Sequence, residues 1–377
     1  MIKVLHIVEN FNGQATEHWL YQAMRYMSEL GVEFDWSFYS ILGRPGLWDD
    51  NVAAIGGKII YSPVKLNNNF HFFKALRKVI DDGKYEILHS HHDILSAIYF
   101  FASAGLPLKK RIIHIHNTSL SIPTSSNFKK FLLHEPMRQT CLQWANNLVG
   151  VSGVALDAFL KGKERIPGRD MVINCGIDMA PFHRILPGRH AFLQSFGLLP
   201  DSKILLFVGR MTHYKNPCFV IEVLSHISKL DSTVCAIFAG SGPLEDEVRM
   251  LAKQKSLESR VKVLGWHGDV PALMRSCDML IWPGLEEPRE GLGLGVVEAQ
   301  AAGLPVLMSR SVPEEAIVVR ELVDVLPLVA GAEVWAEWTL QILSRGSTNR
   351  EGALTAMEGS SFAISQSAAN IRALYEI

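Results

Sequence analysis

Residues 283–306 read PGLEEPREGLGLGVVEAQAAGLPV and follow directly on the apolar run Met279–Trp282. The run predicts a buried strand, and the glycines at 291 and 293 stand where a helix begins. Apolar residues then recur at helical spacing as far as Gly303, and Val306–Leu307 predicts another strand. Strand, helix and strand in this order form the unit from which parallel sheets with helices on both faces are built.

The same stretch carries polar groups that suit a phosphorylated ligand. Gly291, Leu292 and Gly293 offer backbone N–H groups at the positive end of a helix dipole, an arrangement that binds phosphate. Glu290 can accept hydrogen bonds from sugar hydroxyls, and Glu298, two turns further on, can reach a vicinal diol such as a ribose. An ordinary helix–strand turn would explain the glycines, but it leaves Glu298 unexplained on an apolar helix face.

The same alternation of apolar runs and helix-like stretches continues through the rest of the chain. In the first half it predicts strands at Lys3–Val8, Glu33–Tyr39, Lys58–Tyr61, Ile87–His89, Arg111–Ile115, Asn147–Val151 and Met171–Asn174. In the second half it predicts strands at Ile204–Val208, Val234–Ala239, Val261–Leu264, Met279–Trp282, Val306–Leu307 and Asp324–Leu326. Among the predicted helices, Thr16–Leu30 and Phe70–Asp81 end near Gly31 and Gly83, as helix C-termini should.

Two series of strands, with a turn-rich segment at Pro181–His190 between them, indicate two domains, as does the length of 377 residues. We therefore predict an α/β protein with two Rossmann-like domains facing each other across a cleft, over residues 1–188 and 195–358. One long helix over Ser360–Ile377 should follow. Ligands of such sheets bind outside the carboxyl ends of the strands, so residues at those ends are the functional candidates.

The composition is that of an ordinary globular protein, with 48% hydrophobic and 20% charged residues. Five cysteines, never spaced as CxxC, indicate reduced thiols, and no apolar run reaches the roughly 18 residues of a membrane span. We therefore predict a cytoplasmic protein. Residues 1–195 carry 21 Lys and Arg against 16 Asp and Glu, and the remainder 16 against 22. This basic excess is either a solvated face or a patch that docks on anionic lipid at the inner face of a membrane.

A second group of candidates follows the first strand of the second domain, in Phe207-Val-Gly209-Arg210-Met-Thr-His-Tyr-Lys215. Arg210 through its planar fork and Lys215 as a point charge can bracket a diphosphate. Fixed cations in a dry site also stabilise the charge that develops on a departing nucleoside diphosphate. An exposed basic turn is the alternative, and it explains Lys215 more readily than Arg210. Gly240, after the next strand, adds another strand–glycine–helix junction at the same predicted edge.

Two strand ends of the first domain carry candidate residues. Gly13, after the first strand, would let the backbone approach a diphosphate, although an ordinary Asn12-Gly13 turn explains it nearly as well. His114 and His116 share one face at the end of another strand. We place His116 at the cleft with Asn117 beside it as an acceptor contact, and His114 in the core or behind the site.

The segment Leu88-His89-Ser-His91-His92-Asp93 contains three histidines and a carboxylate, which are ligand types of a zinc site. Strand alternation, however, points His89 and His91 to one side and His92 to the other. Asp93 is moreover a good N-cap, so a helix should start there. We therefore predict no bound metal and assign His91 to the acceptor pocket.

Taken together, these motifs resemble those of the family-4 glycosyltransferases with the GT-B fold, and most closely their capsular and exopolysaccharide branch. Glu290-x7-Glu298 and the upstream Gly-Arg210-x4-Lys215 carry the resemblance. Further matches are His116-Asn117, Val149-Gly-Val-Ser152, Ile173-Asn-Cys-Gly-Ile-Asp178 (the family's NGID with a cysteine inserted), Arg260–Gly265, Gly303-Leu-Pro-Val306 and the terminal helix. Asn12-Gly13 departs from the family's Gly-Gly, and the loop from Leu285 to Arg289 is unusually charged.

The resemblance implies a retaining, metal-independent hexosyltransferase without a cofactor. It would take a nucleotide-sugar, a UDP-sugar first and GDP-mannose second, and attack would be front-face, with the leaving phosphate helping to deprotonate a saccharide or lipid-linked acceptor. It assigns catalytic roles to His116, Arg210, Lys215 and Glu290, and donor binding to Gly13, Gly209, Arg210, Lys215, Gly240, Glu290, Gly291, Leu292, Gly293 and Glu298. It also implies that the terminal helix packs back onto the first domain.

Three other classes of protein compete with this interpretation. A nucleotide-sugar epimerase would need acid and base groups around the sugar, for which we see no matching arrangement. A dehydrogenase is disfavoured because Gly291-Leu-Gly-Leu-Gly295 is not a GxGxxG directly after a strand. A catalytically silent nucleotide-binding scaffold would not require the full set of Arg210, Lys215, Glu290 and Glu298, and a measurement of turnover distinguishes it from an enzyme.

Overall fold

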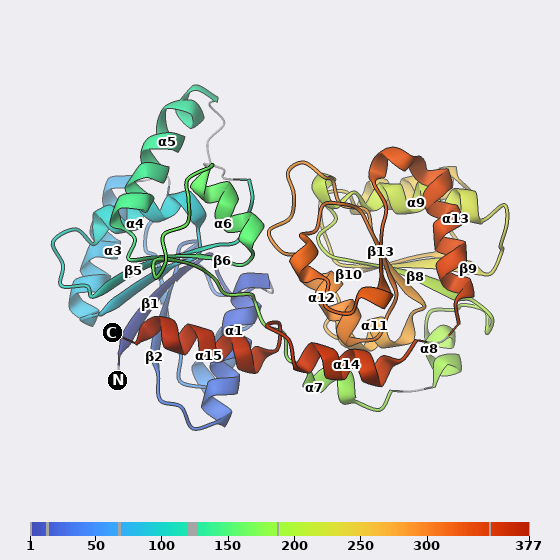
Figure 1. Cartoon of the computed structure of the whole chain (residues 1–377), viewed down its shortest axis with the longest axis horizontal. Helices are drawn as coiled ribbons and strands as arrows, with labels where there is room; N and C mark the ends of the chain where they lie inside the picture. Colours follow the sequence, from blue (N-terminus) through green and yellow to red (C-terminus); the bar gives the residue numbers. More distant parts are fainter. Residues whose placement is uncertain are drawn as a thin grey trace. The chain divides into compact units, whose positions relative to one another are not determined.

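The chain folds into two compact units in a computed structural model that describes residues 2–12, 15–66, 69–119, 127–186, 188–346 and 348–376 (Figure 1). Unit 1 comprises Met1–Ile177 together with Ile364–Ile377, and unit 2 comprises Asp178–Ala363. The chain therefore passes from the first unit to the second and returns at its C-terminal end.

Unit 1 contains a parallel sheet of seven strands in the order β3-β2-β1-β4-β5-β6-β7. The strands are β1 (Lys3–Val8), β2 (Asp35–Ser40), β3 (Lys58–Tyr61), β4 (Ile87–Ser90), β5 (Lys110–Ile115), β6 (Asn147–Gly150) and β7 (Asp170–Val172). All seven predicted strands are present. Their apolar runs are nearly continuous because helices cover both faces of a parallel sheet and bury its strands on both sides.

Helices lie on both faces of the sheet of unit 1 (Figure 1). On one face α3 contacts α4 and α4 contacts α5, and on the other α1 contacts α15. The helices of unit 1 are α1 (Ala15–Glu29), α2 (Asp49–Ala54), α3 (Asn69–Gly83), η1 (Asp93–Leu95), α4 (Ser96–Ala102), α5 (Asn127–Trp144), α6 (Gly153–Leu160) and α15 (Ile364–Tyr375). The sheet is thus doubly wound, as predicted.

Helices α1 and α3 end near Gly31 and Gly83, as expected, but the backbone after each helix differs. Gly31 has φ +67°, and the N–H of the next residue bonds back to the carbonyl of Met27 at 2.9 Å, which is a glycine-terminated helix end. In α3, by contrast, Lys84 takes the left-handed conformation (φ +53°). Helix α3 nevertheless ends at Gly83, as expected. This glycine also allows close packing, because a Cβ there would lie 2.2 Å from the ring of Tyr85.

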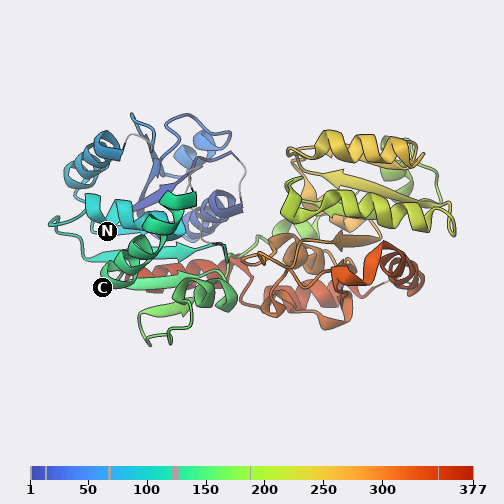
Figure 2. The same ribbon diagram turned by 90° about the horizontal axis from the view of Figure 1, so that it is seen from above.

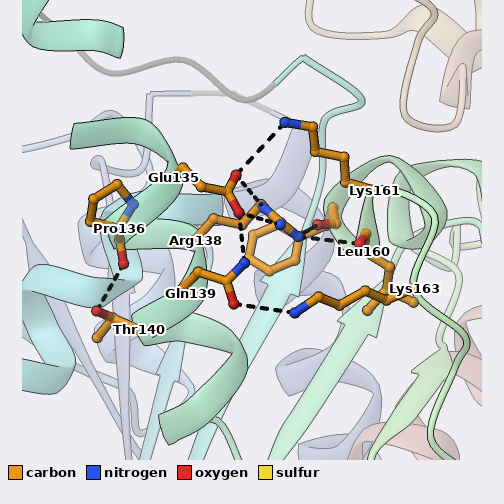
Figure 3. A network of polar contacts seen from close by, with 9 residues as sticks. Glu135, Pro136, Arg138, Gln139, Thr140, Leu160, Lys161 and Lys163 are labelled. Atoms are coloured by element: carbon orange, nitrogen blue, oxygen red, sulfur yellow. Dashed lines mark hydrogen bonds and ion pairs between the residues drawn. The ribbon is translucent and has the colours of Figure 1, made fainter. Parts of the chain in front are cut away.

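A buried arginine ties α5 to the C-terminal end of α6 (Figure 3). Arg138 is 3% exposed and donates to the carbonyl oxygens of Phe159 and Leu160 at 3.0 and 3.2 Å. Its other guanidinium nitrogen pairs with Glu135 at 2.5 Å. The last carbonyls of a helix lack partners within the helix, and a cation there also interacts favourably with the helix dipole. The interaction therefore fixes two helices that flank β6.

The C-terminal helix α15 packs against α1 in unit 1 (Figures 1 and 2). The indole N–H of Trp19 donates to Ser367 Oγ at 2.8 Å. The hydroxyl of Tyr375 lies 2.6 Å from His89 Nδ1, beneath the sheet's central strands. The last residues of the chain thereby contribute to the core of a domain whose first strand begins at Lys3.

Unit 2 contains a parallel sheet of six strands in the order β10-β9-β8-β11-β12-β13. The strands are β8 (Lys203–Val208), β9 (Val234–Ala239), β10 (Val261–Gly265), β11 (Met279–Trp282), β12 (Val306–Met308) and β13 (Val323–Val325), as predicted. The helices are α7 (Ala180–His183), α8 (Arg189–Ser195), η2 (His213–Lys215), α9 (Pro217–Ile227), α10 (Glu245–Gln254), α11 (Val270–Ser276), α12 (Leu294–Ala301), α13 (Gly331–Ser344) and α14 (Arg350–Glu358), with short turns η3 (Glu314–Ala316), η4 (Arg320–Leu322) and η5 (Leu328–Ala330).

Two boundaries differ from those expected. The first unit ends at 177 rather than 188, because α7 contacts α11 and Arg184 pairs with Asp269 of unit 2 at 3.2 Å. The terminal helix begins at Ile364 rather than Ser360, whose hydroxyl accepts a hydrogen bond from the N–H of Phe362 in a turn (3.1 Å). None of the helices in the described ranges has the length and apolarity that crossing a bilayer requires.

Candidate active site

Three loops meet at the carboxyl edge of the sheet in unit 2 because β9, β8 and β11 are neighbours in it. Gly209 and Gly240, which follow β8 and β9, have φ values of +136° and +134°. A Cβ on Gly240 would lie 2.0 Å from the carbonyl oxygen of Gly209, so both the backbone conformation and the close approach require glycine. These predicted glycines therefore bring two strand-end loops into contact.

A lysine and a glutamate form an ion pair across this edge. Lys215 Nζ lies 2.7 Å from Glu290 Oε2, with side-chain exposures of 15% and 8%. The other oxygen of Glu290 accepts the indole N–H of Trp282 at 2.7 Å, and Lys215 Nζ is 4.2 Å from the centroid of the same indole. The sequence predicts that Lys215 and Glu290 bind different parts of a substrate, and in the structure they bind each other.

Trp282 is a member of this site that sequence reasoning missed. Its only signal was its position as the last residue of a predicted strand. The ring also explains Gly295, because a Cβ there would lie 2.4 Å from the indole. The tryptophan thus holds Lys215 and Glu290 on one side and the start of α12 on the other.

The N-terminus of α12 has no side-chain cap. Gly293 is its N-cap residue with φ +81°, and a Cβ there would lie 2.8 Å from the side chain of Val312. Leu292 is 5% exposed, so its side chain anchors the turn and only its backbone is available to a ligand. The arrangement leaves amide groups at the positive end of the helix dipole, as the glycine pattern at Gly291–Gly293 predicted.

Glu298 and Arg210 are the two other charged residues of unit 2 that the sequence analysis assigned to the site. Glu298 lies on α12 and is partly buried, and burial raises the pKa of its carboxyl from 4.5 to about 7. The guanidinium of Arg210 is exposed and donates to the hydroxyl of Tyr214 at 2.9 Å. The site therefore offers an exposed arginine and a lysine that is paired with a carboxylate. It also offers a second carboxyl group, whose ionisation without a partner is energetically costly.

In unit 1, His116 and Asn117 follow β5 and are joined to Asp93. The carboxylate of Asp93 accepts the backbone N–H of His116 at 3.0 Å and the side-chain amide of Asn117 at 2.9 Å. The expectation that Asp93 caps a helix is wrong, because η1 has no side-chain cap and the carboxylate reaches across to the β5 loop instead. Burial raises the pKa of Asp93 to about 6.

The ring of His91 lies behind His116. It is 6% exposed, with Nε2 at 3.2 Å from His6 Nδ1 and Nδ1 at 3.1 Å from His116 Nε2. His116 is partly exposed and its other nitrogen is 3.3 Å from Thr16 Oγ1. The acceptor contact that we predicted for His91 stays a prediction, and in the structure His91 is buried and bonds to His116. His114 is fully buried, as expected, whereas Gly13 lies outside the described residues.

Comparisons with known proteins agree with this geometry. Residues 16–180 match the family described as "Glycosyltransferase Family 4", and residues 189–344 match "Glycosyl transferases group 1". EpsF of Bacillus subtilis (strain 168), named as a glycosyltransferase, is 30% identical over 354 residues, which cover 93% of this chain and 90% of that one. An Escherichia coli "UDP-Gal:alpha-D-GlcNAc-diphosphoundecaprenol alpha-1,3-galactosyltransferase" is 24% identical over 69% of this chain and 67% of its own. The structure of Anabaena HepE in complex with UDP-glucose superimposes with a TM-score of 0.80 at 17% identity, over 99% of both chains.

The two family matches and the relative of 30% identity place this chain, with its two doubly wound sheets, among the glycosyltransferases. It belongs to glycosyltransferase family 4 and has the GT-B fold. The family and fold class expected from the sequence are thereby confirmed.

Proposed function

We propose that the protein is a retaining glycosyltransferase that moves a sugar from a nucleotide-sugar to a saccharide or lipid-linked acceptor in surface polysaccharide synthesis. A UDP-sugar is the favoured donor and GDP-mannose the second choice. The observation that carries the proposal is the Lys215–Glu290 pair at 2.7 Å, next in sequence to an uncapped helix N-terminus. A cation and the amides of a helix N-terminus suit a diphosphate, while a carboxylate suits sugar hydroxyls.

The relatives support the choice of donor and acceptor. One is named for transfer from UDP-galactose to a diphosphoundecaprenol-linked sugar, and one structure of the same fold holds UDP-glucose. In this chain Arg210, Lys215 and the amides of Gly291–Gly293 would hold the diphosphate. Glu298 would hold the ribose and Glu290 the sugar.

The transfer itself would proceed on one face of the sugar. The bond from the anomeric carbon to the diphosphate oxygen breaks, and a bond to the acceptor oxygen forms on the same face. The acceptor proton passes to the departing phosphate, whose charge is stabilised by Lys215 and Arg210 rather than by a metal ion. His116 would lie beside the reacting sugar, with Asn117 on the acceptor side.

Nucleotide binding tests the donor site. We expect one of UDP, GDP and ADP to raise the melting temperature of the wild type, because a ligand at a hundredfold excess over its Kd stabilises the folded state by about 2.7 kcal/mol. Glu298→Ala should abolish this shift, whereas Glu337→Ala on the exposed face of α13 should keep it. The donor site is assigned wrongly if no nucleotide shifts the wild type or if both variants respond equally. Turnover of the matching nucleotide-sugar then separates an enzyme from a silent scaffold.

The basic excess of the first 195 residues suggests peripheral attachment to a membrane. We expect the protein to float with vesicles that contain phosphatidylglycerol, and less so at high salt, because screening weakens contacts between exposed charges. Equal flotation with neutral phosphatidylcholine vesicles would remove this part of the proposal.

A further inference from the structure

Five histidines of unit 1 form one buried cluster, and the proposed transfer uses only one of them. They come from β1, β4 and β5, which are neighbours in the sheet, and from the residues that follow β4 and β5. Because alternate residues of a strand share a face, all five point to the same side. The members of this histidine cluster are His6, His89, His91, His114 and His116.

The ring nitrogens of the cluster approach each other as metal ligands do. One nitrogen each from His91, His114 and His116 lies within 4.8 Å of the other two, and His6, His89 and His91 form a second such group. The distance from His91 Nδ1 to His116 Nε2 is 3.1 Å. Two nitrogens at about 2.1 Å from a tetrahedral zinc ion are about 3.4 Å apart, so the nitrogens of His91 and His116 already lie at a spacing close to that of two zinc ligands.

The hydrogen bond that His114 makes on the side away from the cluster determines which of its ring nitrogens can bind a metal. His114 Nε2 lies 3.3 Å from the carbonyl oxygen of Ile173. A carbonyl only accepts, so the proton of this neutral ring sits on Nε2 and Nδ1 carries a lone pair. That Nδ1 is buried and has no hydrogen-bond partner among the described residues. An outer N–H bound to a backbone carbonyl, with an unpartnered inner nitrogen, is the arrangement found around metal-ligating histidines.

We propose that His91, His114 and His116 bind a divalent transition-metal ion of the zinc type. This group is favoured over the one with His6 and His89 because His116 is partly exposed, which leaves an entry path and an open fourth ligand position. The second group is buried throughout, where an ion would have no access to water. Asp93, bonded to the backbone of His116 at 3.0 Å, supplies a nearby carboxylate to balance the charge.

The hydrogen bonds in the rest of the cluster are compatible with the tautomer of His91 that metal binding requires. A metal on His91 Nδ1 requires the proton of that ring to lie on Nε2, which is 3.2 Å from His6 Nδ1. His6 then carries its own proton on Nε2, 3.4 Å from the hydroxyl oxygen of Tyr375, and that hydroxyl donates to His89 Nδ1 at 2.6 Å. Tautomers shift along the chain, and no proton leaves the protein.

This site differs from the one considered from sequence. His92 bonds to Tyr99 at 2.9 Å and, like Asp93, is absent from both groups of candidate ligands in the described part of the chain. The ligands come instead from two neighbouring strand ends. The sequence analysis predicted no bound metal for the chain, and the present proposal departs from that prediction because the sheet brings His91 together with His114 and His116.

Cobalt spectroscopy tests the site without any substrate. We expect chelator-treated full-length protein to bind one equivalent of Co²⁺ with the visible absorption of a low-coordinate, nitrogen-ligated ion, and Zn²⁺ to bleach that band. His114→Asn should weaken binding about 100-fold or more, since even outer-sphere changes cost 10–100-fold. His92→Asn, at a partly buried histidine next to His91, should bind as the wild type does.

The cobalt titration can support the metal site or overturn it. Absence of the band in the wild type, or an equal loss in His114→Asn and His92→Asn, would overturn the site. If His114→Asn fails to fold by circular dichroism, His116→Asn, at a partly exposed position, takes its place with the same expectation. Binding is read without donor or acceptor, so failure of the proposed transferase function leaves this result unaffected.

Discussion

Replacing Lys215 by methionine is expected to lower kcat/KM by about 10²- to 10³-fold, which corresponds to about 3–4 kcal/mol. The ammonium lies 2.7 Å from Glu290 and both side chains are largely buried. Its removal takes away a fixed cation from the leaving diphosphate. It also leaves the Glu290 carboxylate buried with the Trp282 N–H as its remaining described partner, which is destabilising. Initial rates at varied nucleotide-sugar concentration measure the effect.

Two further variants separate chemistry from folding. Lys253→Met, at an exposed position in the last turn of α10, removes the same charge from the surface and should leave kcat/KM unchanged. Lys215→Met combined with Glu290→Gln removes both charges, so its melting temperature should recover relative to Lys215→Met while its activity stays low. An activity of Lys215→Met within about tenfold of the wild type, or full recovery of activity in the double variant, contradicts the role assigned to the pair.

Glu298→Gln is expected to stabilise the ligand-free protein at pH 8 by about 2 kcal/mol. Burial raises the pKa of Glu298 from 4.5 to about 7 in the folded state. Below pH 4.5 both states are protonated and the shift has no effect; between the two pKa values the folded state holds the extra proton, so the free energy of unfolding falls as pH rises. Above pH 7 the full penalty of about 3 kcal/mol applies, reduced here because the side chain is partly exposed. Glutamine never ionises and escapes this penalty.

Urea unfolding at pH 5 and pH 8 measures this difference. The stabilisation by Glu298→Gln should be present at pH 8 and mostly absent at pH 5, while the exposed Glu337→Gln should change neither value. Equal stabilisation at both pH values would show that the carboxyl is not ionised at a cost. The same variant should lose its response to nucleotide, because a ribose diol that donates to the carboxylate offsets the cost of its charge. Residues that lower the stability of the unliganded protein but bind its ligand are common at binding sites.

The strands of both sheets were predictable because each is a short apolar run between turns. Parallel strands under two layers of helices must be apolar on both faces, so the signal is continuous and strong. Gly209, Gly240 and Gly293 were also predictable as loop glycines, and their positive φ values give the physical reason. Helix ends were less certain. Helix α3 ends at Gly83 as predicted, but Lys84 takes the left-handed conformation there. Asp93 bonds to the loop after β5 rather than capping its own helix.

What only the tertiary structure decided is which distant residues touch. Lys215 and Glu290 are 75 positions apart and meet because β8 and β11 are adjacent in the sheet. His6, His91 and His114 meet because β1, β4 and β5 are neighbours, and Tyr375 joins them because α15 packs against α1. Local patterns of hydrophobicity determine strands, glycines and the chemical type of each candidate side chain. These local patterns do not determine the order of the strands in a sheet. The contact between Lys215 and Glu290 and the cluster of five histidines therefore form only when the crossover connections place the strands side by side.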